Sequence, residues 1–223
     1  MGKTDEDPRD QLIEVGDEVV RAGLVVGSGG NLSARIPGTD DIWVTATGTW
    51  LNRLGRSDFV AVGVANGAVH RSVRVPPTSE LLLHLATYRR RPDIAAVVHL
   101  HPQTVLLLDA LGERIRLVTT DHAYYLRRII TVPFRRPGTA ELADEAAAAT
   151  ADGTDCVILA HHGCSVLADS VGLAHKRALY LEEAARLTYR ALLLGRADTM
   201  ADCPAEFTRA IDRAAGTGEL PAV

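Results

Sequence analysis

Hydrophobic positions along the chain follow two spacings, one typical of helices and one typical of strands. Apolar residues recur at three- and four-residue intervals over 9–24, which predicts a helix. Further helices are predicted over 79–90, 102–110, 140–150, 204–214 and from 169 or 170 to 194. Short apolar runs between turn residues predict strands at 32–35, 42–45, 59–63, 68–71, 94–101, 129–132, 155–160 and 164–167.

The connections between these elements indicate the fold class. Asn66-Gly67 is a strong hairpin signal between two of the strands, whereas other strands alternate with helices. Residues 115–128 predict a further short strand followed by a loop. Together the pattern predicts an α/β fold, a single three-layer α/β/α domain with a central mixed, mainly antiparallel sheet.

Composition narrows the class of protein. With 223 residues, 47% of them hydrophobic, the chain is expected to form one domain over 1–223, with 1–8 flexible and 215–223 a C-terminal tail. A net charge of -4 gives no reason to expect nucleic acid. Neither a signal peptide nor a membrane span is predicted, and three cysteines without CxxC spacing fit a reducing cytoplasm.

Two pairs of histidines end apolar runs. His99 and His101 lie two residues apart on a predicted strand, so both imidazoles project from the same face. Such a pair can present two nitrogen ligands to one metal ion. His161 and His162 end a second run, before Gly163. We expect His162 to be the third ligand and His161 to point to the opposite face or to support the ligands.

A carboxylate and three polar turns complete the candidate site. Glu80 lies in the first turn of a predicted helix, directly after Thr78 and Ser79, where free amides favour an anion such as phosphate. The turns over 27–31 and 45–48 supply further amides and hydroxyls. Glu80 is therefore a candidate base beside the metal, with helix-dipole stabilisation as the plainer alternative.

Two other residues leave alternatives open. His84 lies four residues after Glu80 on the same helical face. It is either a residue of the site or a histidine packed in the core. Cys164 is a second candidate ligand, although cysteine is also a common small buried residue.

The motifs GSGGN (27–31), TATG (45–48), TSE (78–80), HLH (99–101) and HHG (161–163) occur in an order that resembles the class II aldolase/adducin family. The resemblance runs from about residue 10 to 195 and is strongest to the zinc-dependent L-fuculose-1-phosphate aldolases. It implies a homotetramer with active sites at subunit interfaces.

The resemblance also implies roles for individual residues. Zinc, or another divalent metal, would be held by His99, His101 and His162, and Glu80 would contact the metal and then act as acid/base. The implied phosphate-binding residues are Ser28, Gly29, Asn31, Thr47, Gly48, Thr78 and Ser79. A tyrosine from a neighbouring subunit would protonate the aldehyde oxygen, and Tyr124 and Tyr125 are the candidates, although neither matches the motif position cleanly.

The implied reaction is reversible cleavage of a ketose 1-phosphate to dihydroxyacetone phosphate and an aldehyde. L-fuculose 1-phosphate and 5-deoxy-ketose 1-phosphates are the expected kinds of substrate. Epimerases of the superfamily carry aspartate where this chain has Glu80, which favours carbon–carbon cleavage. Decarboxylation or dehydration of a sugar (acid) phosphate and a non-catalytic adducin-like role remain the alternatives.

Overall fold

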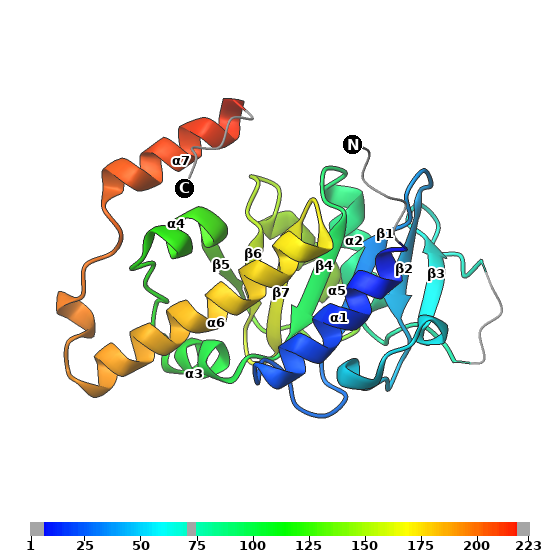
Figure 1. Cartoon of the computed structure of the whole chain (residues 1–223), viewed down its shortest axis with the longest axis horizontal. Coiled ribbons are helices and arrows are strands. Elements are labelled where there is room, and N and C mark those ends of the chain that lie inside the picture. The colour runs from blue at the N-terminus through cyan, green and yellow to red at the C-terminus, as the bar shows by residue number, and fades with distance from the viewer. Residues whose placement is uncertain (1–6, 71–74, 218–223) are drawn as a thin grey trace.

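The computed structural model describes residues 7–70 and 75–217 and is built around a mixed sheet (Figure 1). The seven strands found within these residues follow the order β3-β2-β1-β4-β7-β6-β5. Every neighbouring pair is antiparallel except β5 and β6, which are parallel. The strands are β1 (Asn31–Arg35), β2 (Asp41–Thr45), β3 (Phe59–Gly63), β4 (Ala96–Leu100), β5 (Ile129–Val132), β6 (Cys156–Leu159) and β7 (Gly163–Ala168).

Helices cover both faces of the sheet, which confirms the predicted three-layer α/β architecture. Figure 1 shows α1 and α6 crossing one face, with α2 and α5 behind the other. The helices are α1 (Pro8–Arg21), α2 (Leu81–Arg90), α3 (Gln103–Leu111), α4 (Thr120–Leu126), α5 (Ala140–Ala149), α6 (Val171–Leu193) and α7 (Ala205–Thr217). Short 3-10 turns form at Leu51–Arg53, Arg56–Asp58 and Ala197–Thr199.

The central strands β1 and β4 have different side chains on their two faces. Leu32 and Val98 face one another and belong to the large core under α1 and α6. On the opposite face, Asn31 pairs with His99 and Ser33 with Val97. Because neighbouring residues of a strand point to opposite faces, this second face places polar groups under α2.

Local signals differ from the structure in two places. The predicted strand over 68–71 is wrong over its described residues, where only an isolated bridge joins Val69 to Val62; Arg71 lies outside the described residues. Residues 115–128 were expected to form a short strand and a loop, but α4 forms instead. The reason is a cap, since the Thr119 hydroxyl accepts a hydrogen bond from the His122 amide.

The ends of the described chain are helical. Asp7 caps α1, so helix begins at Pro8. At the other end α7 continues to Thr217 and packs on α4 through the cluster of Ala123, Cys203 and Ile211. The remaining residues of the segments predicted as flexible or as a tail lie outside the described residues. No helix within the described part is long and apolar enough to cross a membrane.

A buried carboxylate anchors the helix that follows the HLH motif. Glu182 of α6 is 2% exposed and accepts hydrogen bonds from the Thr104 hydroxyl at 2.6 Å and from the Val105 amide at 3.2 Å. These groups lie in the first turn of α3, where amides have no partner within the helix. The contact therefore ties the segment after His101 to the long helix α6.

Candidate metal centre

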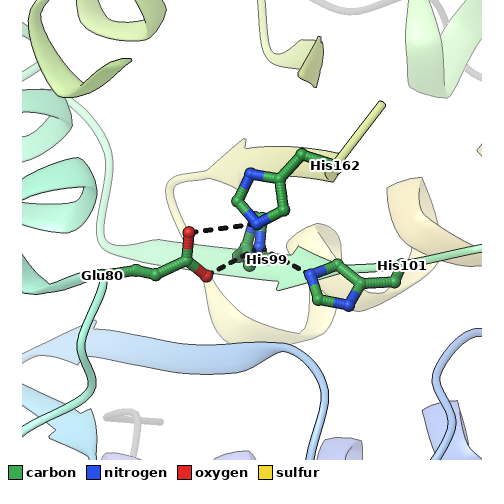
Figure 2. Close-up of side chains that lie close together, drawn as sticks. All are labelled: Glu80, His99, His101 and His162. Atoms are coloured by element: carbon green, nitrogen blue, oxygen red, sulfur yellow. Dashed lines mark hydrogen bonds and ion pairs between the residues drawn. The ribbon is translucent and has the colours of Figure 1, made fainter. Parts of the chain in front are cut away.

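Four side chains from three parts of the fold converge on one point (Figure 2). His99 lies in β4 and His101 directly follows that strand. His162 occupies the tight turn between β6 and β7, while Glu80 precedes the first residue of α2. One ligand atom of each side chain lies within 4.8 Å of those of the other three, so the structure brings together the predicted ligands and carboxylate.

The distances place one nitrogen of each imidazole toward the shared space. His99 Nε2 lies 3.1 Å from His101 Nε2 and 3.0 Å from Glu80 Oε2. The other carboxylate oxygen, Glu80 Oε1, lies 3.2 Å from His162 Nε2. On the far side of its ring, His99 Nδ1 lies 3.3 Å from the Ser165 hydroxyl, which helps to set the ring orientation.

Burial and mutual repulsion favour neutral imidazoles at this centre. Burial, with repulsion from His99 and His162, lowers the pKa of His101 to about 4. The pKa of His162 is also lowered, first by burial and then by His99. Neutral imidazoles are the form that binds metal ions.

Glu80 is held as a carboxylate. Burial alone would raise its pKa. The hydrogen bond with His99 acts in the opposite direction, as does the hydrogen bond from the Asn31 side chain. The net pKa of Glu80 therefore lies well below its ordinary value.

The donor set fits a divalent cation. Three imidazole nitrogens and one carboxylate oxygen are a combination that zinc and related ions accept. Glu80 Oε1 is buried and lies 3.2 Å from His162 Nε2, but no described group donates a hydrogen bond to it. A buried carboxylate oxygen without a hydrogen bond is costly. A cation bound among these four groups would satisfy that oxygen, so the cluster is suited to divalent metal binding.

Gly163 allows the two histidine segments to approach. A Cβ added at this position would lie 2.5 Å from the Leu100 carbonyl oxygen and 2.6 Å from His101 Cδ2. Both distances are shorter than side chains tolerate, so any larger residue would push β4 and the His101 ring away. The glycine of the HHG motif is thus explained by close packing.

Replacing Gly163 with alanine should lower the free energy of unfolding by about 1–3 kcal/mol, the usual range for overpacking. It should also weaken Zn²⁺ binding, because the clash includes His101. The matched control is Gly172→Ala in α6, where nothing lies within 4 Å of the added Cβ and helix propensity favours alanine by up to about 1 kcal/mol. Equal stability and Zn²⁺ affinity for the two variants, by urea unfolding and calorimetry, would contradict this explanation.

The predicted phosphate-binding residues all line one pocket of about 250 Å³ beside the cluster. A bridge between Ala46 and Pro77 and a hydrogen bond from the Thr78 amide to the Thr45 carbonyl bring the second and third motif loops together. Gly30 packs the first loop against the His99 carbonyl. The pocket is lined by Ser28, Gly29, Asn31, Thr47, Gly48, Thr78, Ser79, Glu80, His101, His162 and neighbouring loop residues.

Two residues of this region have partners that the sequence did not indicate. The Asn31 amide donates to Glu80 Oε2 at 3.0 Å and its oxygen lies 2.5 Å from His84 Nε2, so its side chain holds the carboxylate. His84 itself is fully buried and lies outside the four-ligand cluster. The sequence did contain a signal for the role of His84, because its four-residue spacing from Glu80 places both side chains on one face of the helix.

The remaining candidates lie outside the cluster. Tyr125 of α4 stacks on Tyr180, with ring centroids 4.7 Å apart, and Tyr124 packs beside the α4–α7 cluster. Neither tyrosine lines the pocket within one chain. His161 is exposed and its ring faces Phe134, and Cys164 is buried in the large core.

Comparison with known proteins agrees with this geometry. Residues 10–189 match the family described as class II aldolase and adducin N-terminal domain. The L-fuculose phosphate aldolase of Methanocaldococcus jannaschii is 33% identical over 184 residues, which cover 82% of this chain and 97% of that protein. The 3-oxo-tetronate 4-phosphate decarboxylase of Escherichia coli K12 is 31% identical over 194 residues, covering 85% of this chain and 89% of that protein.

A solved structure shows the same fold. An L-fuculose 1-phosphate aldolase superposes with a TM-score of 0.79 at 28% identity, covering 94% of this chain and 95% of that one. The family match spans all five motifs that surround the histidine cluster and its pocket. On this combination of sequence, fold and site, the chain belongs to the class II aldolase and adducin family.

Proposed function

We propose that this protein is a metal-dependent lyase that reversibly cleaves a ketose 1-phosphate to dihydroxyacetone phosphate and an aldehyde. The observation that carries the proposal is the three-histidine and glutamate cluster beside the pocket of hydroxyls and amides. The similarity to L-fuculose phosphate aldolases supports the substrate class. We propose Zn²⁺ as the metal, held by His99, His101 and His162 with Glu80.

The metal, when bound, would polarise the substrate carbonyl and offset negative charge that develops beside it. The Ser28, Thr47 and Ser79 side chains line the pocket beside the cluster, and we propose that they bind the phosphate. Thr78 already accepts a hydrogen bond from the Glu80 amide at 3.2 Å, which leaves its hydroxyl proton for an anion. Loop amides at Gly29 and Gly48 would add donors.

Glu80 is the proposed acid/base. As the C3–C4 bond breaks, its electrons stay with the three-carbon phosphate and the C4 hydroxyl gives its proton to a second acid/base. C3 then gains a proton from Glu80, which must have moved from the cluster and become protonated before it can donate. Beside the histidines Glu80 has a low pKa, which suits a ligand better than a base. Moving away from His99 would remove the hydrogen bond that lowers this pKa, while burial would raise it.

The second acid/base is proposed to come from another subunit. Within one chain Tyr124 and Tyr125 do not line the pocket, so either residue could reach it only across an interface. We therefore propose a homo-oligomer, with a tetramer as the arrangement implied by the family resemblance. In it, the phenolate form of one of these tyrosines takes the C4 hydroxyl proton during cleavage, and the phenol returns it to the aldehyde oxygen in the reverse direction.

Decarboxylation of a sugar-acid phosphate is the second candidate, because the Escherichia coli relative that decarboxylates 3-oxo-tetronate 4-phosphate is 31% identical to this chain. Both reactions leave electrons on a carbon beside a carbonyl and would use the same cluster. They differ in the group that leaves, an aldehyde or carbon dioxide.

Product analysis separates the two candidates. We expect the purified, Zn²⁺-loaded protein to release dihydroxyacetone phosphate from L-fuculose 1-phosphate or a 5-deoxy-ketose 1-phosphate, but not from unphosphorylated L-fuculose. Carbon dioxide from 3-oxo-tetronate 4-phosphate, without cleavage of any ketose phosphate, would establish the decarboxylase instead. Failure to turn over either class would overturn the proposal.

A further inference from the structure

We propose that His84 is a positioning residue that holds the Glu80 carboxylate at the metal centre through the side-chain amide of Asn31. His84 lies on α2, one helical turn after Glu80, and Asn31 lies between the two. The inference rests on the proposed function only for its kinetic test. Its structural tests concern the four-ligand cluster alone.

The arrangement is a polar ladder between α2 and β1, formed by Glu80, His84 and Tyr88 on the helix and Asn31 and Ser33 on the strand. Four residues of helix rise about 6 Å and two residues of strand about 6.6 Å. Because the two rises are nearly equal, every fourth residue of α2 lies opposite every second residue of β1. This match lets successive polar side chains meet along the interface.

The hydrogen bonds of the ladder run from Tyr88 to Glu80. The Tyr88 hydroxyl lies 2.9 Å from Ser33 Oγ, which lies 2.7 Å from His84 Nδ1. His84 Nε2 lies 2.5 Å from Asn31 Oδ1, and Asn31 Nδ2 donates to Glu80 Oε2 at 3.0 Å. Each side chain thus contacts the next, with no break between the buried tyrosine and the metal centre.

The chemistry of these groups determines which atom donates in each bond. A carboxylate only accepts, so Asn31 must turn its NH₂ group to Glu80 and its oxygen to His84. The oxygen can only accept, so the proton of the neutral His84 ring lies on Nε2. His84 Nδ1 is then an acceptor, and the Ser33 hydroxyl donates to it.

Burial supports this single protonation state. His84 is 0% exposed, and burial, with repulsion from His99, lowers its pKa to about 3. A neutral imidazole offers one donor and one acceptor, which is what Asn31 and Ser33 require. Without the Nε2 proton, the Asn31 amide could rotate and turn its oxygen toward the Glu80 carboxylate, where the two acceptors would repel.

The tautomer can be measured without any substrate. We expect ¹H–¹⁵N correlation spectra of the Zn²⁺-loaded, ¹⁵N-histidine-labelled protein to show His84 protonated on Nε2, with its signals assigned by their absence from His84→Gln. Protonation on Nδ1 would overturn the proposal, because His84 could then not donate to Asn31. The tautomer is read on the unaltered protein, and either folded His84 variant, His84→Gln or His84→Asn, serves for the assignment.

Two substitutions separate positioning from mere packing. His84→Gln keeps a donor near the Nε2 position. The shorter side chain of His84→Asn ends near the Nδ1 position, so it places no donor near Nε2. We expect His84→Asn to weaken Co²⁺ binding about 10-fold or more, the usual effect of removing a group that orients a metal ligand. The Co²⁺ visible spectrum should change as well. The Co²⁺ affinity of His84→Gln should stay within about threefold of that of the unaltered protein, a smaller change than the ~10-fold loss expected for His84→Asn. Thr87→Val, a buried change on α2 whose hydroxyl bonds to the Leu83 carbonyl of the same helix, is the matched control outside the ladder and should leave the spectrum unchanged.

Kinetics add a further comparison. In an assay of ketose 1-phosphate cleavage, His84→Asn should lower kcat more than it changes KM, with rescue in His84→Gln. Wild-type Co²⁺ spectra in both His84 variants, or equal losses in both, would overturn the positioning role. Absence of cleavage in the unaltered protein would contradict the proposed function alone, because the tautomer and the Co²⁺ spectra still decide this inference.

Discussion

Replacing His162 with alanine should lower the Zn²⁺ affinity at least ~100-fold. Removing a residue that only orients a metal ligand already lowers metal affinity by about 10–100-fold, and His162 is proposed to bind the ion itself. His162 Nε2 is one of three imidazole nitrogens at the centre, and no other described histidine belongs to the cluster. The loss therefore leaves two imidazoles and Glu80 to hold the ion. Calorimetric titration of the metal-free protein with Zn²⁺ measures this directly, and product release should fall in parallel.

The neighbouring histidine provides a matched control. His161 is exposed, and its ring packs on Phe134 rather than on the cluster. His161→Ala should bind Zn²⁺ as the unaltered protein does. If the two variants lost affinity equally, the assignment of His162 as the ligand would be wrong.

Replacing Glu80 with glutamine should lower kcat by a factor of about 10²–10⁴, the usual contribution of a general acid/base. The amide is nearly the same size and still offers an oxygen, but it cannot exchange a proton with substrate at neutral pH. Because three imidazoles remain, bound Zn²⁺ should be retained at saturating concentration. Metal analysis and kinetics on the same preparation separate the two effects.

Proton exchange tests the same residue without the aldehyde. In deuterated water the unaltered protein should exchange a C3 hydrogen of dihydroxyacetone phosphate, and Glu80→Gln should lose most of this exchange. Glu14→Gln, a surface change on α1, is the control for removing one negative charge. Wild-type exchange in Glu80→Gln would remove Glu80 from its acid/base role.

The histidines of the cluster could be predicted as candidate ligands from sequence because short-range geometry determines how they are presented. Alternation along a strand puts His99 and His101 on one face whatever the rest of the fold does. The position of His162 at the end of a second apolar run is likewise visible in the local sequence; in the structure it lies in the turn between β6 and β7, where His161 has a φ of 57°. The convergence of these two segments was suggested by motif order and confirmed by the pairing of β4 with β7.

Other features depend on which segments become neighbours. The cap that makes α4 a helix was visible at Thr119, but short apolar stretches do not separate helix from strand by periodicity. Asn31 was predicted to bind phosphate from its motif alone. Its contacts with Glu80 and His84 depend on β1 lying under α2, which no local pattern specifies.

The sequence by itself determined the α/β class, most of the elements, and the three histidines and the carboxylate that the structure brings together. Each of these follows from periodicity, turn chemistry or residue type within a short stretch. Only the tertiary structure decided that His84 and Asn31 form a buried ladder to Glu80. Those side chains are about 50 residues apart, and their hydrogen bonds exist because β1 and α2 pack with matching rises.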